Sequence, residues 1–172
     1  MTTPTPSVPA RVQLGASTVN RKWYLDVNTA LGGAAATWTP VGGMTDFKPG
    51  RDANKEDSSD FDSGGFMSKT KTGEAWSVVL KVARKVRRAT PTAYDPGQEF
   101  LRAKGQGKMG VANSCEIRFY EMEEGGPRVE AFQGLCSVDY SDDGGGMTAL
   151  STASITLDGQ GALVAIAHPA AA

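Results

Sequence analysis

The chain has 172 residues, a formal net charge of −1 and only 31 residues of the types Leu, Ile, Val and Phe. This length favours one domain, and the small number of large apolar residues limits the core that a single copy can bury. The longest apolar run, residues 162–167, is far shorter than the roughly 20 residues of a membrane-spanning helix. No secretory signal pattern is visible in residues 1–10. These features exclude a membrane helix and favour synthesis in the cytoplasm.

Charge is divided unevenly along the chain, with a formal +6 over residues 1–112 and −7 over residues 113–172. Opposed fields on one small protein can steer head-to-tail association of copies, and two ordinary solvated faces are the alternative. One stretch of the chain is strongly basic. Because this stretch contains no interleaved aromatic residues and the whole chain has a pI of about 5.8, the sequence is not typical of a dedicated nucleic-acid binder. This stretch comprises Lys81, Arg84, Lys85, Arg87 and Arg88.

The first 41 residues predict an arm followed by two strands. Residues 1–20 are rich in Thr and Pro, which indicates an extended arm that frays or docks on a neighbour. Apolar and polar residues alternate over residues 21–27, which predicts a half-buried strand. A second strand is expected over residues 37–41, and Pro40 indicates that this strand lies at a sheet edge or ends there.

Residues 42–72 form the most unusual part of the sequence, because Gly, Ser, Thr and charged residues dominate it. Its centre, residues 52–62, holds five acidic residues and one lysine. Connections of this length in compact domains are usually functional or disordered. Five large apolar residues favour a loop or long hairpin that packs on a partner, ordered at the latest on assembly. They are Met44, Phe47, Phe61, Phe66 and Met67.

One long strand and one helix follow. Residues 74–86 alternate strongly and predict a strand that is long for a small domain. The helix is expected to end at Gly105, after Asp95 as the capping residue and Pro96 at the first helical position.

The remaining sequence predicts two hairpins. Residues 113–122 and 128–140 form the first, which brings Cys115 roughly opposite Cys136. A disulfide between them is geometrically feasible, whereas two reduced thiols fit a cytoplasmic protein. Residues 150–157 and 161–167 are expected to form the second hairpin.

Catalytic and metal chemistry lack their residues in this sequence. Cys115, Cys136 and His168 are the only cysteines and the only histidine, too few for a zinc site or for Cys/His or Ser/His catalysis. No convergent acid, base and nucleophile can be assembled. We therefore expect no enzyme, no metal and no cofactor.

The order of the segments resembles that of the major tail tube proteins of long-tailed (siphovirus-type) bacteriophages. The resemblance extends over residues 23–166. Its carriers are WTPVGGMTDF at residues 38–47, TGEAWSVVL at residues 72–80, the lone helix, the hairpin that ends at residues 134–140, and SITLDGQG at residues 154–161.

This resemblance implies a mainly β fold: a two-sheet β-sandwich or barrel with one short flanking α-helix. Residues 21–167 would form the single tail-tube domain, in which residues 42–72 are a long inserted inter-subunit loop. An extended N-terminal arm, residues 1–20, and a C-terminal tail, residues 168–172, would flank the domain.

The implied function is structural. Six copies would form a ring, and stacked rings would form the virion's tail tube, assembled in the host cytoplasm. The partners implied are further copies of the chain, together with tail tip, tape-measure and tail terminator proteins. Double-stranded DNA would pass through transiently without sequence-specific binding, and no membrane partner is implied.

Candidate site residues follow from this resemblance and from the charge pattern. An acidic lumen lets DNA slide, because phosphate affinity grows with each paired cation; which strand face points inward depends on the register. Contacts between subunits or rings are expected at Phe47, Arg51, Asp52, Glu56, Asp57, Asp60, Phe61, Asp62, Phe66, Arg84, Lys85, Arg87 and Arg88, and lumen residues at Glu116, Glu121, Glu130 and Asp139.

Two alternatives remain open at this point. One is a monomeric immunoglobulin-like or carbohydrate-binding β-sandwich of a virion or surface scaffold, which would present an aromatic patch. The other is a ring-forming protein that caps a tail tube.

Overall fold

The computed structural model describes residues 14–32, 35–62, 64 and 66–170, so most of the predicted N-terminal arm lies outside the described residues. Within these residues, two short 3-10 turns, η1 (Asn20–Lys22) and η2 (Gly110–Asn113), accompany eight strands and one α-helix. These are β1 (Trp23–Asn28), β2 (Trp38–Pro40), β3 (Met44–Asp57), β4 (Lys69–Ala83), α1 (Pro96–Gly105), β5 (Ser114–Glu121), β6 (Ala131–Asp143), β7 (Thr152–Gly159) and β8 (Val164–Ala165). The expectation of a mainly β chain with one helix is confirmed.

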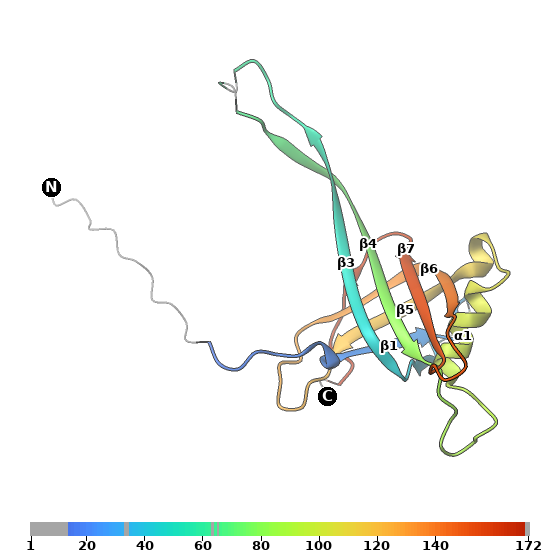
Figure 1. Ribbon diagram of the computed structural model, residues 1–172. Helices are drawn as coiled ribbons and strands as arrows, with labels where there is room; N and C mark the ends of the chain where they lie inside the picture. The colour runs from blue at the N-terminus through green and yellow to red at the C-terminus, as the bar shows by residue number, and fades with distance from the viewer. Residues whose placement is uncertain (1–13, 33–34, 63, 65, 171–172) are drawn as a thin grey trace.

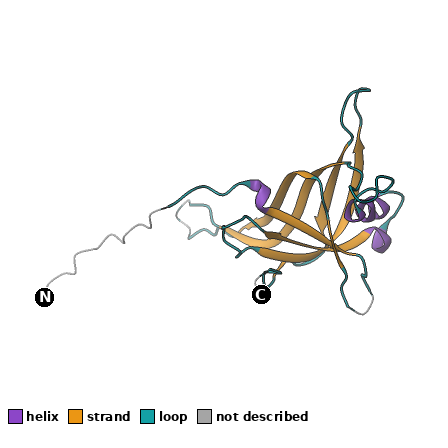
Figure 2. Cartoon of the chain, turned by 90° about the horizontal axis from the view of Figure 1, so that it is seen from below, coloured by secondary structure: helices purple, strands orange, loops and turns teal. Residues whose placement is uncertain are grey.

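All eight described strands belong to one antiparallel sheet in the order β2-β1-β5-β6-β7-β4-β3, with β8 paired to β6. The two-sheet sandwich is therefore not confirmed. The sheet instead curls around its own interior, with α1 packed beside it (Figures 1 and 2). Strands far apart in the sheet order consequently meet through their side chains: the rings of Trp23 in β1 and Phe47 in β3 stack 5.7 Å apart.

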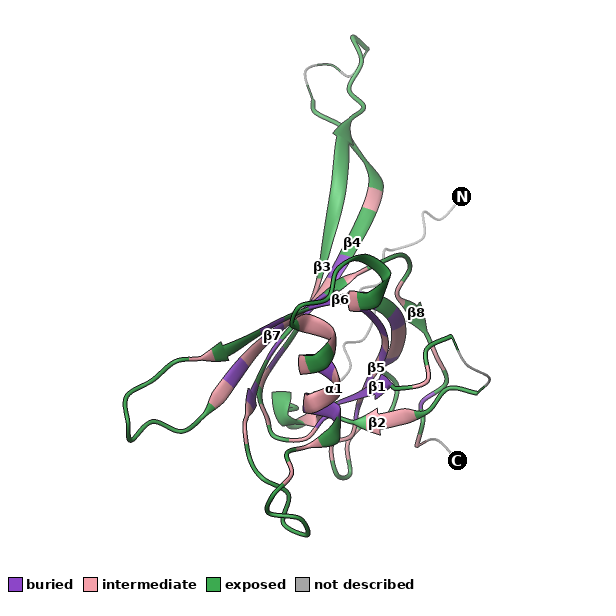
Figure 3. Cartoon of the chain, turned by 90° about the vertical axis from the view of Figure 1, so that its right-hand side faces the viewer, coloured by how far each residue is buried: buried purple, intermediate pink, exposed green. Residues whose placement is uncertain are grey.

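The core lies inside this curve, where buried residues gather (Figure 3). Alternation explains its composition, since Cys115, Ile117 and Phe119 of β5 point inward while the residues between them are less buried. On α1, Leu101 is fully buried in the same core. The capping prediction is confirmed as well: the carboxylate of Asp95 accepts a hydrogen bond of 3.0 Å from the backbone N–H of Gln98.

The strand predictions hold for most of the chain. β1, β2, β5, β6 and β7 fall within a few residues of their expected positions. Pro40 lies in β2, the first strand of the sheet order, as its missing N–H requires. Cys115 and Cys136 are directly opposite in the β5–β6 register, with their sulfur atoms 3.7 Å apart and both thiols free.

Residues 42–72, for which the sequence left a loop or a long hairpin open, are mostly a hairpin, because β3 and the start of β4 pair from Met44–Val82 to Asp57–Lys69. One other prediction about a segment is wrong. The predicted final hairpin is absent, since β8 continues along the same side of β6 that β7 occupies. Residues 160–163 bulge between the two strands, and the Gln160 N–H donates to the Leu135 carbonyl at 2.8 Å.

Trp76 of β4 explains two glycines inside neighbouring strands. Its indole lies against Gly134 of β6 and Gly159 of β7, where added Cβ atoms would come within 2.5 and 2.3 Å of the ring. The indole N–H donates to the Gly161 carbonyl at 2.8 Å. Gly134 and Gly159 are therefore required because the indole approaches the backbone closely, and not because of their backbone conformation.

Gly159→Ala should therefore destabilise the chain by about 1–3 kcal/mol, because the new methyl group displaces the indole from a packed core. Urea denaturation followed by tryptophan fluorescence measures the change. Gly144→Ala is the matched control, because open space surrounds Gly144. Equal stability of the two variants would contradict the proposed packing.

Candidate assembly interface

A projecting arm is the most conspicuous feature of the surface (Figure 1). β4 pairs with β7 only along its second half, from Ser77 to Ala83. Its first half pairs with β3 alone, from Trp76–Arg51 outward to Lys69–Asp57. Among the described residues, the arm (residues 52–75) is thus a ribbon of two strands with no third strand beside it.

Polar contacts of modest strength hold this ribbon together. Glu74 forms ion pairs with Arg51, at 3.1 Å, and with Lys71, and both cations lower the pKa of this carboxylate. The Asn54 amide donates to the Thr72 hydroxyl at 3.2 Å. Exposed ion pairs contribute little to stability, and an isolated two-stranded hairpin is marginal in water. The arm therefore gains most from packing on another surface.

The tip of the arm exposes large apolar side chains. Phe61, Phe66 and Met67 have relative exposures of 109%, 83% and 74%. They stand beside acidic residues of the same tip, including Asp57 and Asp62. Exposed apolar groups in a polar surround are typical of a protein–protein contact site.

The opposite end of β4 carries a basic surface. Two loops, residues 84–95 and 144–151, lie together there, since the backbone N–H of Arg84 donates to the backbone carbonyl of Ser151 at 2.9 Å. We call these two loops the loop end. In Figure 1 the first of them lies below the sheet, whereas the arm points upward. Exposed cations on this loop are Lys85, Arg87 and Arg88.

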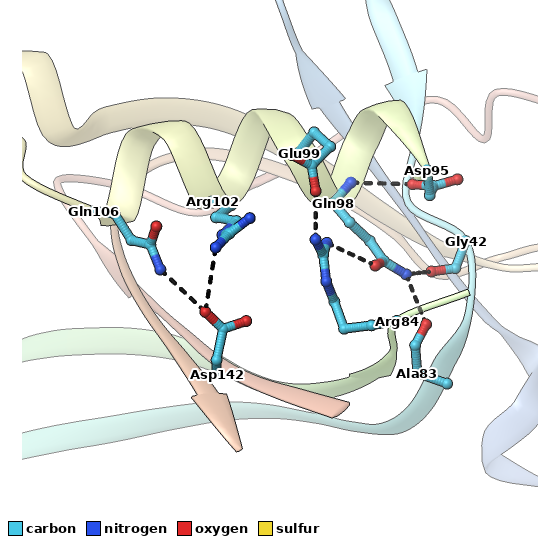
Figure 4. Close-up of polar contacts among 9 residues, drawn as sticks. All are labelled: Gly42, Ala83, Arg84, Asp95, Gln98, Glu99, Arg102, Gln106 and Asp142. Atoms are coloured by element: carbon cyan, nitrogen blue, oxygen red, sulfur yellow. Dashed lines mark hydrogen bonds and ion pairs between the residues drawn. The ribbon is translucent and has the colours of Figure 1, made fainter. Parts of the chain in front are cut away.

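Arg84 does not belong to this exposed set (Figure 4). Its guanidinium, with a side-chain exposure of 4%, pairs with Glu99 at 2.5 Å and donates to the Gln98 side chain at 3.2 Å. The Gln98 amide in turn donates to the carbonyls of Gly42 and Ala83, at 2.7 and 3.2 Å. Every polar group of this buried glutamine has a partner, as burial demands.

This network ties the first turn of α1 to the end of β4 and to the connection between β2 and β3 (Figure 4). The last turn of the helix is tied by Asp142, which lies 3.6 Å from Arg102 and 3.3 Å from the Gln106 amide. Arg84, predicted to contact a neighbouring subunit, is thus engaged inside the chain with Glu99 and Gln98.

Phe47, predicted as an anchor on a neighbour, lies in the core of its own chain. It is 5% exposed and packs on Trp23 and Phe119 in the core, because its position in β3 points inward. The guanidinium of Arg51, four residues further along β3, lies over the Phe132 ring at 5.0 Å. Asp52 and Glu56 are exposed on the arm, and Asp60 and Phe61 lie at its tip.

Glu121, expected in the lumen, is buried instead. Its carboxylate accepts hydrogen bonds from the Val129 and Glu130 N–H groups, at 2.8 and 3.0 Å, and pairs with Lys22 at 3.0 Å. Burial by itself would raise the pKa of this group, but the two N–H donors and Lys22 outweigh it and lower the pKa to about 2. Glu121 thus fixes the connection between β5 and β6 and is unavailable to a channel.

The other lumen candidates do not form one acidic wall. Glu116 is half-buried and accepts from the side chains of Asn28 and Gln133, at 2.7 and 2.8 Å. Glu130 is exposed, 3.7 Å from Lys22. Asp139 is exposed on the outer face of β6.

Asp139 belongs to a regular outer face that sequence reasoning missed. The register of β6, β7 and β4 places its residues in three rows across the sheet. Most residues of this outer face carry small hydroxyl or carboxylate groups. The alternation of Ser, Thr and Asp in residues 137–141 and 154–158 could have indicated this face from the sequence. The rows are Ser137–Asp158–Ser77, Asp139–Thr156–Val79 and Ser141–Ser154–Lys81.

The lone histidine has a structural position. His168 is buried; its Nε2 lies 2.7 Å from the Glu121 carbonyl oxygen, and its ring packs edge-on against Tyr120. No group of three or more His, Cys, Asp or Glu side chains within residues 14–32, 35–62, 64 and 66–170 is arranged to hold a metal. In the same ranges, α1 and the short turns are not long and apolar enough to cross a membrane.

Comparison with known proteins gives a result at the level of structure only. No protein-family model and no curated protein matches the sequence. Among the solved chains that match, two share 12% identity with this chain, cover 88% of it and 100% of their own length, and have TM-scores of 0.66 and 0.60. The first belongs to the tail of an empty gene transfer agent (GTA) particle with C6 symmetry, the second to the virion of the native particle. At this identity the likeness establishes the fold, and the expected tail-protein fold is thereby confirmed.

Glu121→Gln should lower stability at pH 7 by about 1–3 kcal/mol, because charge-assisted hydrogen bonds are lost. A carboxylate whose folded pKa is about 2, against an ordinary value of 4.5, contributes fully above pH 4.5 and loses its contribution as the pH falls toward 2. Urea denaturation at pH 7 and pH 3 should show a smaller difference from the wild type at pH 3. The exposed Glu124→Gln is the control, and a difference independent of pH would contradict the assignment.

Proposed function

We propose that this chain is a structural virion protein whose copies form hexameric rings that stack into a phage tail tube, the channel for genome delivery into the host. The projecting arm carries the proposal. A two-stranded ribbon with Phe61, Phe66 and Met67 exposed at its tip is poorly suited to a monomer and well suited to a subunit that reaches its neighbour. The fold shared with a C6-symmetric tail supports it.

Ring formation has a physical basis in the sheet edges. Among the described strands, β2 pairs only with β1 and β3 only with β4. Each strand therefore leaves one edge of hydrogen-bonding groups unpaired, and edges of this kind are usually covered or closed. Continuation of the sheet from copy to copy around a ring would pair them.

The outer face of β6, β7 and β4 is the best candidate for the channel wall. Small hydroxyl side chains and Asp139 offer no array of cations to hold phosphates, so DNA could slide past them. Lys81, which lies 3.6 Å from Asp143, is the one basic residue in the three rows. Tail tip, tape-measure and tail terminator proteins would be the further partners, and assembly would take place in the host cytoplasm.

Electron microscopy of the purified protein at high concentration tests the proposal directly. We expect filaments with a central channel and sixfold end views. Discrete single rings would favour a tube-capping protein instead. Small single particles at every concentration and salt would favour the monomeric β-sandwich and overturn the tube.

Removal of the arm should abolish tube formation without unfolding the domain. Asp52 and Ala75 are directly paired, so an Asn-Gly turn can replace residues 53–74 and close the shortened hairpin. Circular dichroism should show a folded β protein, while sedimentation and microscopy should show no filaments. Thr70→Ser, a conservative change on the arm, is the control and should assemble normally. Filaments from the shortened chain would contradict the role of the arm.

A further inference from the structure

The loop end, opposite the arm, exposes apolar side chains that its own chain leaves uncovered. Met147 and Leu150 have relative exposures of 102% and 87%. They lie on residues 144–151, a stretch without a charged residue. The adjoining loop supplies Lys85, Arg87 and Arg88. This end therefore combines an apolar patch with positive charge.

The tip of the arm has the complementary character. Its apolar residues are Phe61, Phe66 and Met67. Asp60 and Asp62 flank Phe61 and Lys69 follows Met67, and residues 52–75 of the arm carry six acidic and three basic side chains, a formal net charge of −3. Opposite signs of charge around two apolar patches specify orientation and partner. Methionine sulfur also makes favourable contacts with aromatic rings.

We infer that the loop end is the seat for the arm tip of a second copy, with Phe61 and Phe66 packed against Met147 and Leu150. The acidic residues of the tip then face the basic residues of the loop end. This inference rests on the proposed function and names the receiving surface for the arm. Such a contact joins two different patches, so each copy keeps one tip and one seat free for the next, and the assembly grows head to tail.

A second copy is required because the two patches of one chain are far apart. They lie at opposite ends of β4, a strand of 15 residues, which spans about 45–50 Å at 3.3 Å per residue. β3 and, in its second half, β7 hold this strand extended. The tip of the arm therefore does not reach the loop end of its own chain.

Cross-linking of mixed copies tests the seat. Phe61→Cys copies are assembled together with Met147→Cys copies, and a short bis-maleimide reagent is added. The native thiols of Cys115 and Cys136 are fully buried and do not compete. We expect a covalent dimer in the mixed tubes and none from either variant alone. Phe61→Cys mixed with Asp139→Cys is the control, which should give no dimer.

The proposed contact between the arm tip and the loop end and the proposed tube-forming function can fail separately, and the results distinguish them. If both variants assemble into tubes but no Phe61–Met147 dimer forms, the seat is overturned and the proposed function stands. If the wild-type chain never forms tubes, the proposed function fails and the seat with it. A second variant, Met147→Ser with Leu150→Ser, changes only exposed side chains and should raise the protein concentration needed for assembly at least tenfold. Assembly at the wild-type concentration would also overturn the seat.

Discussion

The unequal pairing of β4 governs the rest of the structure. Along Ser77–Ala83 this strand has a neighbour on each side, and along Lys69–Trp76 it has only β3. A strand with two neighbours and one buried face is stable within a single copy, whereas a ribbon exposed on both faces is marginal. One strand thus joins a domain with its own core to a ribbon that has no third strand beside it among the described residues.

The junction between these two halves is reinforced from inside. Trp76 lies where β4 leaves the sheet, packed on Gly134 and Gly159. At the other end of the strand, Arg84 and Gln98 fix α1 to the sheet. A rigid base gives a thin ribbon a defined direction. The polar residues of α1 fix one end of the strand that carries the arm.

Charge in the sequence predicted the exposed charged surfaces only in part. Lys85, Arg87 and Arg88 are exposed as expected, but Arg84 in the same run is bound inside the chain. The Glu121 carboxylate likewise has internal partners, an ion pair with Lys22 and hydrogen bonds from two backbone N–H groups. A run of like charges indicates a basic or acidic segment, yet it does not reveal which member has an internal partner, because such partners come from distant parts of the chain.

The sequence by itself determined the local structure. Alternation predicted β1, β5, β6 and β7, Pro40 predicted an edge strand, and Asp95 predicted the start of α1, because these signals depend on residues adjacent in sequence. Only the tertiary structure decided between a loop and a hairpin for residues 42–72 and showed that residues 52–75 project as an arm, that β8 lies beside β6, and that Phe47 is internal. β3 is mostly polar, and a polar segment lacks the alternation of apolar residues that marks a half-buried strand. Its pairing with β4, and which of its faces points inward, were therefore decided by contacts between distant segments.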